Sequence, residues 1–370
     1  MKLGIVTYTS LHCNFTNYGT VLQAWAMQQT LRKLEGVEPI LVDYCPVTMK
    51  DKDPLDPMKN MWDTNSEARK LCEMSLPAIR ENFKKFYDFY HQKMDITQAE
   101  YDVDTFDDVK NEGIERFLIG SDSIFDIEEF GLDDVYFANT YLMKENSIAY
   151  APSFQDSIDN YQKDDLVALN KCLLNFKRFS LRENQLIPYV KENVREDVQQ
   201  VLDPTLLLNP EEYNVITGKA QTNEKYILYY SRRYNPQMES FVYKLAQQTG
   251  LKVVEISLRA NNSDKAEMRY DAGVEEFLSL MKNSEYVVTN SYHCLIFAIQ
   301  YSRSFFVFSR EHCDRKIVEL LQMVGLEDRY CKTSDIPQVE DINYTSVRDV
   351  INRNKENSLA YLNEAVESLK

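Results

Sequence analysis

The chain alternates between short apolar runs rich in β-branched and aromatic residues and longer stretches in which apolar residues recur at helical spacing. Residues 3–8 form a strand-like run, residues 21–34 carry the helical pattern, and a second strand-like run occupies residues 38–44. Gly36 separates the helical stretch from the second run, as expected at a helix C-terminus. This order is typical of a β-α-β unit, in which a helix joins two parallel strands.

The same alternation continues through the first half of the chain, with one interruption. Further strand-like runs lie at 115–122, 146–154 and 176–184. Residues 46–105 are instead rich in charge, methionine and aromatic residues and contain several prolines. We expect this stretch to be a helical excursion with breaks at the prolines.

A domain junction is predicted where two prolines lead into the polar stretch 217–225. Beyond it, four strand-like runs alternate with four helical patterns, which indicates a second doubly wound sheet. A chain of 370 residues is long enough to bury two cores. We therefore predict an α/β protein with two Rossmann-like doubly wound domains, at residues 1–210 and 222–340, and a C-terminal helix at 345–370 that packs back on the first domain.

The composition narrows the classes of partner. The net charge of −16 repels nucleic acid and acidic membranes, so we expect no nucleic-acid partner. No window has the length and apolarity of a transmembrane helix, and the N-terminus lacks a signal-peptide pattern. Seven cysteines without a CxxC pair argue against a disulfide framework and a cysteine zinc site. We expect a cytoplasmic protein with reduced thiols, no metal and no cofactor.

Ligands of open α/β sheets bind beyond the carboxyl ends of the strands, because the N-termini of the following helices point there. This rule selects mainly small polar residues at the ends of the predicted strands. The candidate binding residues are Asn17, Tyr18, Gly19, Ser121, Asp122, Ser153, Ser231, Arg232, Asn290 and Ser291. Asp122 could cap the following helix or act as an acid or base. Residues 17–19 lack a glycine-rich cluster, so the pattern predicts neither a dinucleotide fingerprint nor a P-loop.

His293 stands where a buried strand gives way to a helix, in the stretch VVTNSYHCLIFAIQ. Asn290 and Ser291 are residue types that cap helices, so His293 falls in the first helical turn and faces the predicted crevice. The helix dipole there attracts anions. His293 is therefore a candidate ligand or acid/base group, and the alternative is a histidine that caps its helix or packs against Tyr292.

Two arginines follow predicted strands in an otherwise acidic chain, Arg182 and Arg310. The planar guanidinium binds carboxylate or phosphate through two parallel hydrogen bonds, which suits both residues to an anionic ligand. The alternative is that Arg182 pairs with Glu183 or another nearby acid, and that Arg310 pairs with Glu311.

Seven segments, in order, resemble motifs of the polysaccharide pyruvyl transferase family. They are NYGTVLQAWAMQQTLRKL at 17–34, FLIGSDSIFD at 117–126, IAYAPSF at 148–154, FSLREN at 179–184, VLDPTLLL at 201–208, VVTNSYHCLIFAIQYSRSFFVF at 287–308 and RKIVELLQMVGLEDR at 315–329. The resemblance implies a fold similar to the glycosyltransferase B architecture, with the active site between two Rossmann-like domains.

The resemblance also implies an activity, the transfer of a pyruvyl group from phosphoenolpyruvate to a saccharide as a cyclic ketal. This reaction would serve the synthesis of a surface polysaccharide in the cytoplasm. The family's histidine corresponds to His293 and its arginines to Arg182 and Arg310, with Arg315 as the alternative to Arg310. Whether the acceptor is lipid-linked, and hence whether the protein contacts a membrane peripherally, stays open at this point.

Four residues depart from the family pattern, so other functions are also considered. Cys294 stands where the family has glycine, and Ser123, Ile124 and Asp126 differ from the family's segment after GSD, where Asp126 adds a carboxylate. One alternative is a glycosyltransferase that uses a nucleotide sugar on the same fold, since fold alone does not decide between them. The other is a catalytically degenerate member that binds a glycan.

Overall fold

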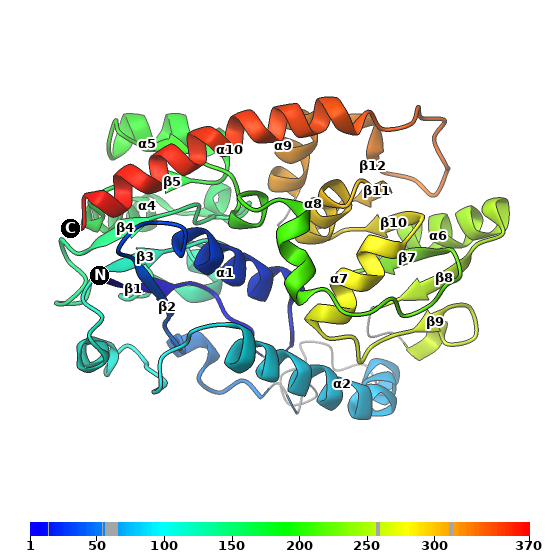
Figure 1. Ribbon diagram of the computed structural model, residues 1–370, viewed down its shortest axis with the longest axis horizontal. Coiled ribbons are helices and arrows are strands. Elements are labelled where there is room, and N and C mark those ends of the chain that lie inside the picture. The colour runs from blue at the N-terminus through cyan, green and yellow to red at the C-terminus, as the bar shows by residue number, and fades with distance from the viewer. Residues whose placement is uncertain (14, 54, 56–65, 257–259, 311–313) are drawn as a thin grey trace.

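A computed structural model describes residues 1–13, 15–53, 55, 66–256, 260–310 and 314–370. Its two larger sheets are parallel and lie side by side, with helices packed around and between them (Figure 1). Both chain termini lie at the same end of the molecule, next to the first sheet (Figure 1). Part of the predicted helical excursion, residues 54 and 56–65, lies outside the described residues.

The first sheet has the strand order β2-β1-β3-β4, and all of its neighbours are parallel. Its strands are β1 (Lys2–Val6), β2 (Glu38–Leu41), β3 (Phe117–Ile119) and β4 (Ser147–Ala149), and a separate parallel pair is formed by β5 (Ser180–Leu181) and β6 (Gln199–Gln200). A single bridge between Ala149 and Phe179 extends the order from β4 towards β5. The strands are buried and apolar because helices cover both faces of a parallel sheet.

Helix α1 (Tyr18–Leu31) is buried along almost its whole length, and Gln29 alone of its residues is not. Its sequence YGTVLQAWAMQQTL is apolar or small around most of the helix, as expected for a helix without a solvent face. It packs on β2 on one side and on α7 (Val274–Asn283) and α8 (Tyr292–Gln300) on the other. α1 therefore joins the two sheets.

The second sheet has the strand order β12-β11-β10-β7-β8-β9, again parallel throughout. Its strands are β7 (Tyr226–Tyr230), β8 (Lys252–Glu255), β9 (Glu267–Met268), β10 (Tyr286–Thr289), β11 (Ser304–Phe308) and β12 (Tyr330–Cys331). The four longer strands correspond to the predicted ones. The edge strands β9 and β12 were not predicted, because a two-residue strand is too short to produce a periodic pattern.

The remaining helices surround these sheets. They are α2 (Ser66–Lys93), α3 (Ile127–Phe130), α4 (Lys163–Cys172), α5 (Ile187–Asn193), α6 (Pro236–Thr249), α9 (Asp314–Val324) and α10 (Tyr344–Glu367). α10 runs along one side of the molecule and spans both sheets (Figure 1). It contacts α9, and its Tyr361 hydroxyl donates a hydrogen bond to the Ala149 carbonyl at the end of β4 (2.9 Å). The last helix thus ties the two halves together.

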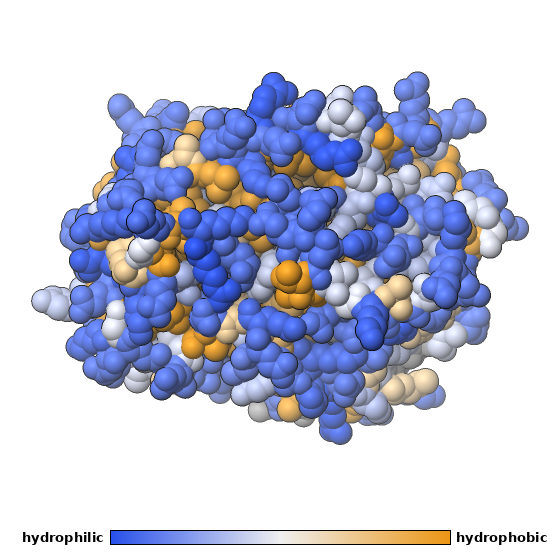
Figure 2. Space-filling model, in the orientation of Figure 1, coloured by the Kyte–Doolittle hydropathy of each residue, from blue (hydrophilic) through white to orange (hydrophobic). Residues whose placement is uncertain are grey.

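The visible surface is mostly hydrophilic, with small scattered apolar patches (Figure 2). This distribution agrees with the charged-residue content of 27% and the net charge of −16. In the part of the chain that the structure describes, no helix combines the length and the apolarity needed to cross a bilayer.

Candidate active site

A cavity of about 570 Å³ lies between the two sheets. Its walls include loops that follow β1, β3, β7, β10 and β11 and the first turns of helices after these strands. The cavity therefore lies at the carboxyl ends of strands from both sheets. The polar and charged residues on its surface include Asn17, Asp122, Ser123, Asp126, Glu128, Glu129, Gln155, Ser231, Arg232, Arg233, Ser291, His293, Arg310 and Lys316. The cavity has the size and polarity of a site for a small polar ligand.

His293 lies in the first turn of α8, as the sequence predicted, and its side chain lines the cavity. Ser291 is the N-cap of the helix, and its Oγ accepts a hydrogen bond from the Cys294 amide (3.4 Å). The His293 ring also lies against α1, where a Cβ built on Gly19 would be 2.1 Å from its Nδ1. Only glycine at position 19 therefore allows α1 to approach the imidazole this closely.

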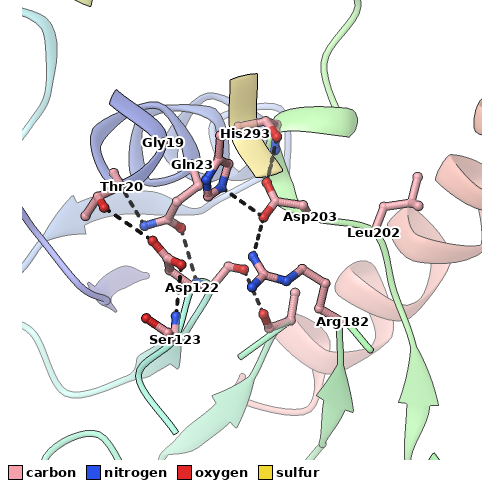
Figure 3. Close-up of polar contacts among 12 residues, drawn as sticks. Gly19, Thr20, Gln23, Asp122, Ser123, Arg182, Leu202, Asp203 and His293 are labelled. Carbon is pink, nitrogen blue, oxygen red and sulfur yellow. Dashed lines mark hydrogen bonds and ion pairs between the residues drawn. The ribbon is translucent and has the colours of Figure 1, made fainter. Parts of the chain in front are cut away.

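A buried carboxylate, Asp203, lies behind His293 (Figure 3). Its Oδ2 is 3.3 Å from His293 Nε2, an ion-pair distance at which the hydrogen-bond direction is poor, and Nε2 has no hydrogen-bond partner among the described residues. The other carboxylate oxygen accepts hydrogen bonds from the Thr205 amide and hydroxyl (3.0 and 2.6 Å). Burial raises the pKa of Asp203, but the charges of His293 and Arg182 outweigh burial and hold this pKa below its ordinary value.

Arg182 is buried behind this carboxylate and does not line the cavity. Its Nη1 donates to Asp203 Oδ2 (2.8 Å) and its Nε to Glu183 Oε1 (3.1 Å), while its guanidinium lies 4.8 Å from the centre of the Tyr292 ring. Burial lowers the pKa of Arg182, but the surrounding anions, Glu183 first, raise it well above its usual range. Arg182 is predicted to contact the ligand, but in the structure two acids hold its guanidinium away from the cavity surface. There it positions Asp203, and through Asp203 it positions His293.

Asp122 follows β3 and lines the cavity with backbone φ at 68°, a conformation that non-glycine residues adopt rarely. Its carboxylate accepts hydrogen bonds from the Thr20 hydroxyl (3.3 Å) and the Ser123 amide (3.0 Å) (Figure 3). Burial raises the pKa of Asp122, and the nearby charges of His293, Arg182 and Lys316 lower it to below its ordinary value. The site therefore contains an ionised carboxylate close to His293.

Cationic side chains from the second half of the chain also line the cavity. They are Arg232, Arg233, Arg310 and Lys316. The Arg232 guanidinium lies 4.6 Å from the centre of the Phe15 ring and donates to the Thr16 carbonyl (3.4 Å), so it reaches across to the loop after β1. A group of cations in one cavity of a chain with net charge −16 is the electrostatic arrangement that attracts an anionic ligand.

Sequence reasoning did not select Lys316, and it offered Arg315 as an alternative to Arg310. In the structure Arg315 does not line the cavity, because it pairs with Asp159 (2.5 Å) and Asp156 (3.8 Å). Lys316 is the next residue of α9, about 100° further round the helix, and this rotation brings it to the cavity. The alternation of strand and helix in the sequence predicts that the start of α9 lies near the site, but it does not show which of its residues points into the cavity.

Three other candidates shape the loops without reaching the cavity surface. Ser121 donates its hydroxyl hydrogen bond to the Ala151 carbonyl (2.7 Å), and the Ser153 Oγ accepts from the Gln155 amide (3.1 Å). The Asn290 side chain accepts from the Arg232 amide and donates to the Arg233 carbonyl (both 2.8 Å). In the structure these three predicted binding residues make hydrogen bonds within the loops and do not line the cavity.

Asn17, Tyr18 and Ser231 all lie at the cavity, as predicted. Asn17 is the N-cap of α1 and accepts from the Gly19 amide (3.1 Å), and the Ser231 hydroxyl donates to the Arg233 carbonyl (2.6 Å). The Tyr18 ring stacks on Phe277 of α7 with centroids 4.4 Å apart, which makes it a packing contact between the two halves as well as part of the wall.

The departure at Cys294 does not affect the cavity. The residue is fully buried in the apolar core beneath α8, and burial raises the pKa of its thiol to about 12. The side chain that replaces the family's glycine therefore points into the core and leaves the cavity surface unchanged.

Ligand atoms of His12, Cys45 and Glu100 lie within 4.8 Å of one another, close enough for a metal to be considered. The His12 Nε2 is 2.7 Å from Asp43 Oδ1. Burial lowers the pKa of His12, but the hydrogen bonds and charges of Asp43 and Cys45 raise it to about 10. A metal would have to displace a firmly held proton from this imidazole, so the group is a poor metal site at neutral pH.

The family model for polysaccharide pyruvyl transferases matches residues 17–312, most of the chain. The chain therefore belongs to the polysaccharide pyruvyl transferase family. A comparison with curated proteins gives no match.

Solved structures of similar fold include sugar-nucleotide enzymes. A UDP-GlcNAc 2-epimerase from Methanocaldococcus jannaschii superimposes with a TM-score of 0.52 at 10% identity, covering 95% of this chain and 92% of that chain. A protein of Listeria monocytogenes, proposed to be a UDP-N-acetylglucosamine 2-epimerase, gives 0.51 at 8% identity, with 97% and 90% covered. These similarities show the fold: two Rossmann-like halves in the glycosyltransferase B arrangement, as the sequence predicted.

Proposed function

We propose that this protein transfers a pyruvyl group from phosphoenolpyruvate to two hydroxyls of a saccharide, forming a cyclic ketal in the synthesis of a surface polysaccharide. The observation that carries the proposal is the set of cations that meets His293 in one cavity of a family member. Phosphoenolpyruvate carries both a carboxylate and a phosphate, and fixed cations stabilise both charges.

The reaction sets requirements that the cavity can meet. A proton adds to the methylene carbon of phosphoenolpyruvate, positive charge develops at C2, a sugar hydroxyl attacks C2, and the bond from C2 to the phosphate oxygen breaks. The second hydroxyl then closes the ketal. One hydroxyl proton replaces the proton consumed at the methylene carbon, and the other leaves with the phosphate, so the site needs groups that move two protons.

The cationic residues are assigned to the donor. Arg310, Lys316 and Arg232 line the cavity and would bind the phosphate and the carboxylate. His293 is assigned to the leaving phosphate, to which it supplies a proton as the C2–O bond breaks. Asp203 and Arg182 hold the His293 ring from behind, and this orientation is their contribution to the reaction.

The experiment that tests this proposal measures whether the protein consumes phosphoenolpyruvate in the presence of a saccharide acceptor. Purified protein is incubated with phosphoenolpyruvate and a panel of p-nitrophenyl hexosides, and inorganic phosphate is measured over time. Phosphate release that depends on both substrates, and that His293→Ala abolishes, is the expected result. In parallel, UDP-N-acetylglucosamine is offered alone and with the same hexosides, because the solved structures of similar fold act on such compounds. Turnover of the sugar nucleotide without use of phosphoenolpyruvate would favour a sugar-nucleotide reaction instead.

A further inference from the structure

One wall of the cavity is acidic and faces the cations. It is formed by the start of α3, where Asp126 is the N-cap and Glu128 and Glu129 lie in the first turn. Asp126 Oδ1 accepts from the Glu128 amide (3.1 Å), so this aspartate also has a structural role. The roles assigned so far leave Glu129 unused, although it lines the cavity.

Glu129 is linked to Asp126 through one amide. The Gln155 Nε2 donates to Asp126 Oδ2 (2.9 Å) and lies 3.5 Å from Glu129 Oε2. Both carboxyl groups therefore share a donor and lie close together on the same wall. Two carboxylates in such proximity repel each other, so that one of them retains its proton to a higher pH.

The charged groups around Glu129 determine whether Glu129 is the carboxyl that keeps its proton to the higher pH. Asp126 and Asp122 are its acidic neighbours, and Lys316 and Arg232 are its cationic ones. The phenols of Tyr8 and Tyr136 and the thiol of Cys13, which come from other parts of the chain, also interact electrostatically with it. Burial, then Asp126 and Asp122, raise the pKa of Glu129 to about 7, and the two cations oppose this shift only in part.

Two carboxyl groups of one cavity thus differ in their protonation. Asp122 is held ionised by His293, Arg182 and Lys316, whereas Glu129, with a pKa of about 7, keeps its proton below this pH and is about half protonated at it. When the pKa values of two neighbouring carboxyl groups shift in opposite directions, one group can act as the acid while the other stays ionised. The thiol of Cys13, with a pKa raised to about 12, and the phenol of Tyr8, with a pKa raised well above its usual range, hold their protons too firmly to replace it.

We propose that Glu129 is the proton-transfer residue of the pyruvyl transfer: its carboxyl O–H gives a proton to the methylene carbon of phosphoenolpyruvate. The resulting carboxylate accepts the proton of the first attacking hydroxyl and returns to its starting state. His293 gives its proton to the departing phosphate and regains one from the second hydroxyl. All atoms and protons balance without a further reactant. The assignment rests on the proposed function.

The first test compares Glu129→Gln with wild type in the phosphate-release assay. Glutamine keeps the size of the side chain and its contact with Gln155 but cannot donate an acidic proton. We expect kcat to fall by about 10²-fold or more, the usual contribution of a positioned acid or base, with little change in KM for phosphoenolpyruvate. Glu115→Gln is the matched control, because Glu115 is an exposed carboxylate at the amino end of β3, remote from the cavity.

The second test uses Asp126→Asn, which removes a negative charge and keeps a good helix N-cap. The acid form of Glu129 is the active one, so wild-type kcat should be high below pH 7 and decline as pH rises through about 7. Without Asp126 the pKa of Glu129 falls, and this decline should move to lower pH. A residue with only a structural role would not produce the shift.

The third test needs no acceptor. The folded protein holds the Glu129 proton up to about pH 7, whereas an unfolded chain releases it near the ordinary value of 4.5. Ionisation therefore penalises the folded state increasingly between these pH values. In urea unfolding, wild type should lose stability relative to Glu129→Gln as pH rises from about 4.5 to about 7.

The outcomes separate the two proposals. A Glu129→Gln variant with near-wild-type kcat, or an Asp126→Asn variant with an unshifted pH profile, overturns the Glu129 assignment while the pyruvyl transfer stands. A constant stability difference across that pH range also overturns it. Wild-type protein that releases no phosphate with any acceptor contradicts the proposed function and the catalytic role of Glu129 with it.

Discussion

His293 of α8 and Gly19 of α1 are in contact across the two halves of the molecule. A single methyl group on Gly19 would lie 2.1 Å from the imidazole Nδ1. This contact means that the helix from the first sheet sets the position of the histidine at the end of the second sheet, and it leads to the first prediction.

Gly19→Ala should displace His293 without unfolding the protein. Alanine favours the helix more than glycine does, so the local cost is the clash with the ring alone. A displacement of about 1 Å of a group in the site can reduce turnover by about 10²-fold. Phosphate release and the melting temperature measure the two effects. Loss of activity with a near-wild-type melting temperature is expected, and full activity would show that the ring position does not matter.

Asp203→Asn should destabilise the fold strongly. Among the described residues, it leaves the buried Arg182 with Glu183 as its one remaining ion-pair partner, and breaking a buried pair costs about 3–5 kcal/mol. Asp197→Asn is the control, because its ion pair with Arg195 is at the surface and contributes about 1 kcal/mol or less. Urea unfolding at neutral pH measures both. Equal losses in the two variants would contradict the role of the buried pair.

Lys316→Gln should weaken donor binding, whereas Arg315→Gln should not. Lys316 lines the cavity, and its neighbour Arg315 pairs with acids outside it. A hydrogen bond to a charged group contributes about 1.5–3 kcal/mol, which corresponds to about a 10- to 100-fold change in affinity. Calorimetric titration with phosphoenolpyruvate measures the effect. The reverse order of the two variants would show that the helix presents its other side to the donor.

Stability should fall in acid as Asp203 and Asp122 take up protons. Both have pKa values in the folded protein below the ordinary 3.8, so their contribution is present above that pH and is lost as pH falls through the folded-state values. Asp203→Asn should therefore lose less stability than wild type when the pH is lowered below about 4. Parallel acid-unfolding curves for the two proteins would contradict this prediction.

Much of the fold could be predicted from the sequence, because parallel sheets bury continuous apolar strands between amphipathic helices. The β-α-β unit at the N-terminus and the four longer strands of the second sheet follow from periodicity. The short edge strands β9 and β12 could not be found that way. α1 was recognised as a helix, but its burial on nearly all sides depends on the second sheet, which a local pattern does not reveal.

The candidate site was predicted less completely. His293 and Asp122 were located because strand ends in α/β folds converge on one cleft. Arg182 was expected at the cavity, yet it lies behind Asp203, because sequence position does not show which neighbour will neutralise a charge. Asp203 lies in the segment VLDPTLLL but was not selected, although it is the one charged residue in an otherwise largely apolar run.

The most direct test of the central claim is the identity of the product. Phosphoenolpyruvate labelled with ¹³C at C2 is incubated with the protein and the hexoside that gives the fastest phosphate release, and the saccharide is examined by carbon NMR. We predict that the label appears as a quaternary ketal carbon bonded to two sugar oxygens, with a methyl group beside it. Label recovered only as unreacted phosphoenolpyruvate or free pyruvate would contradict the account.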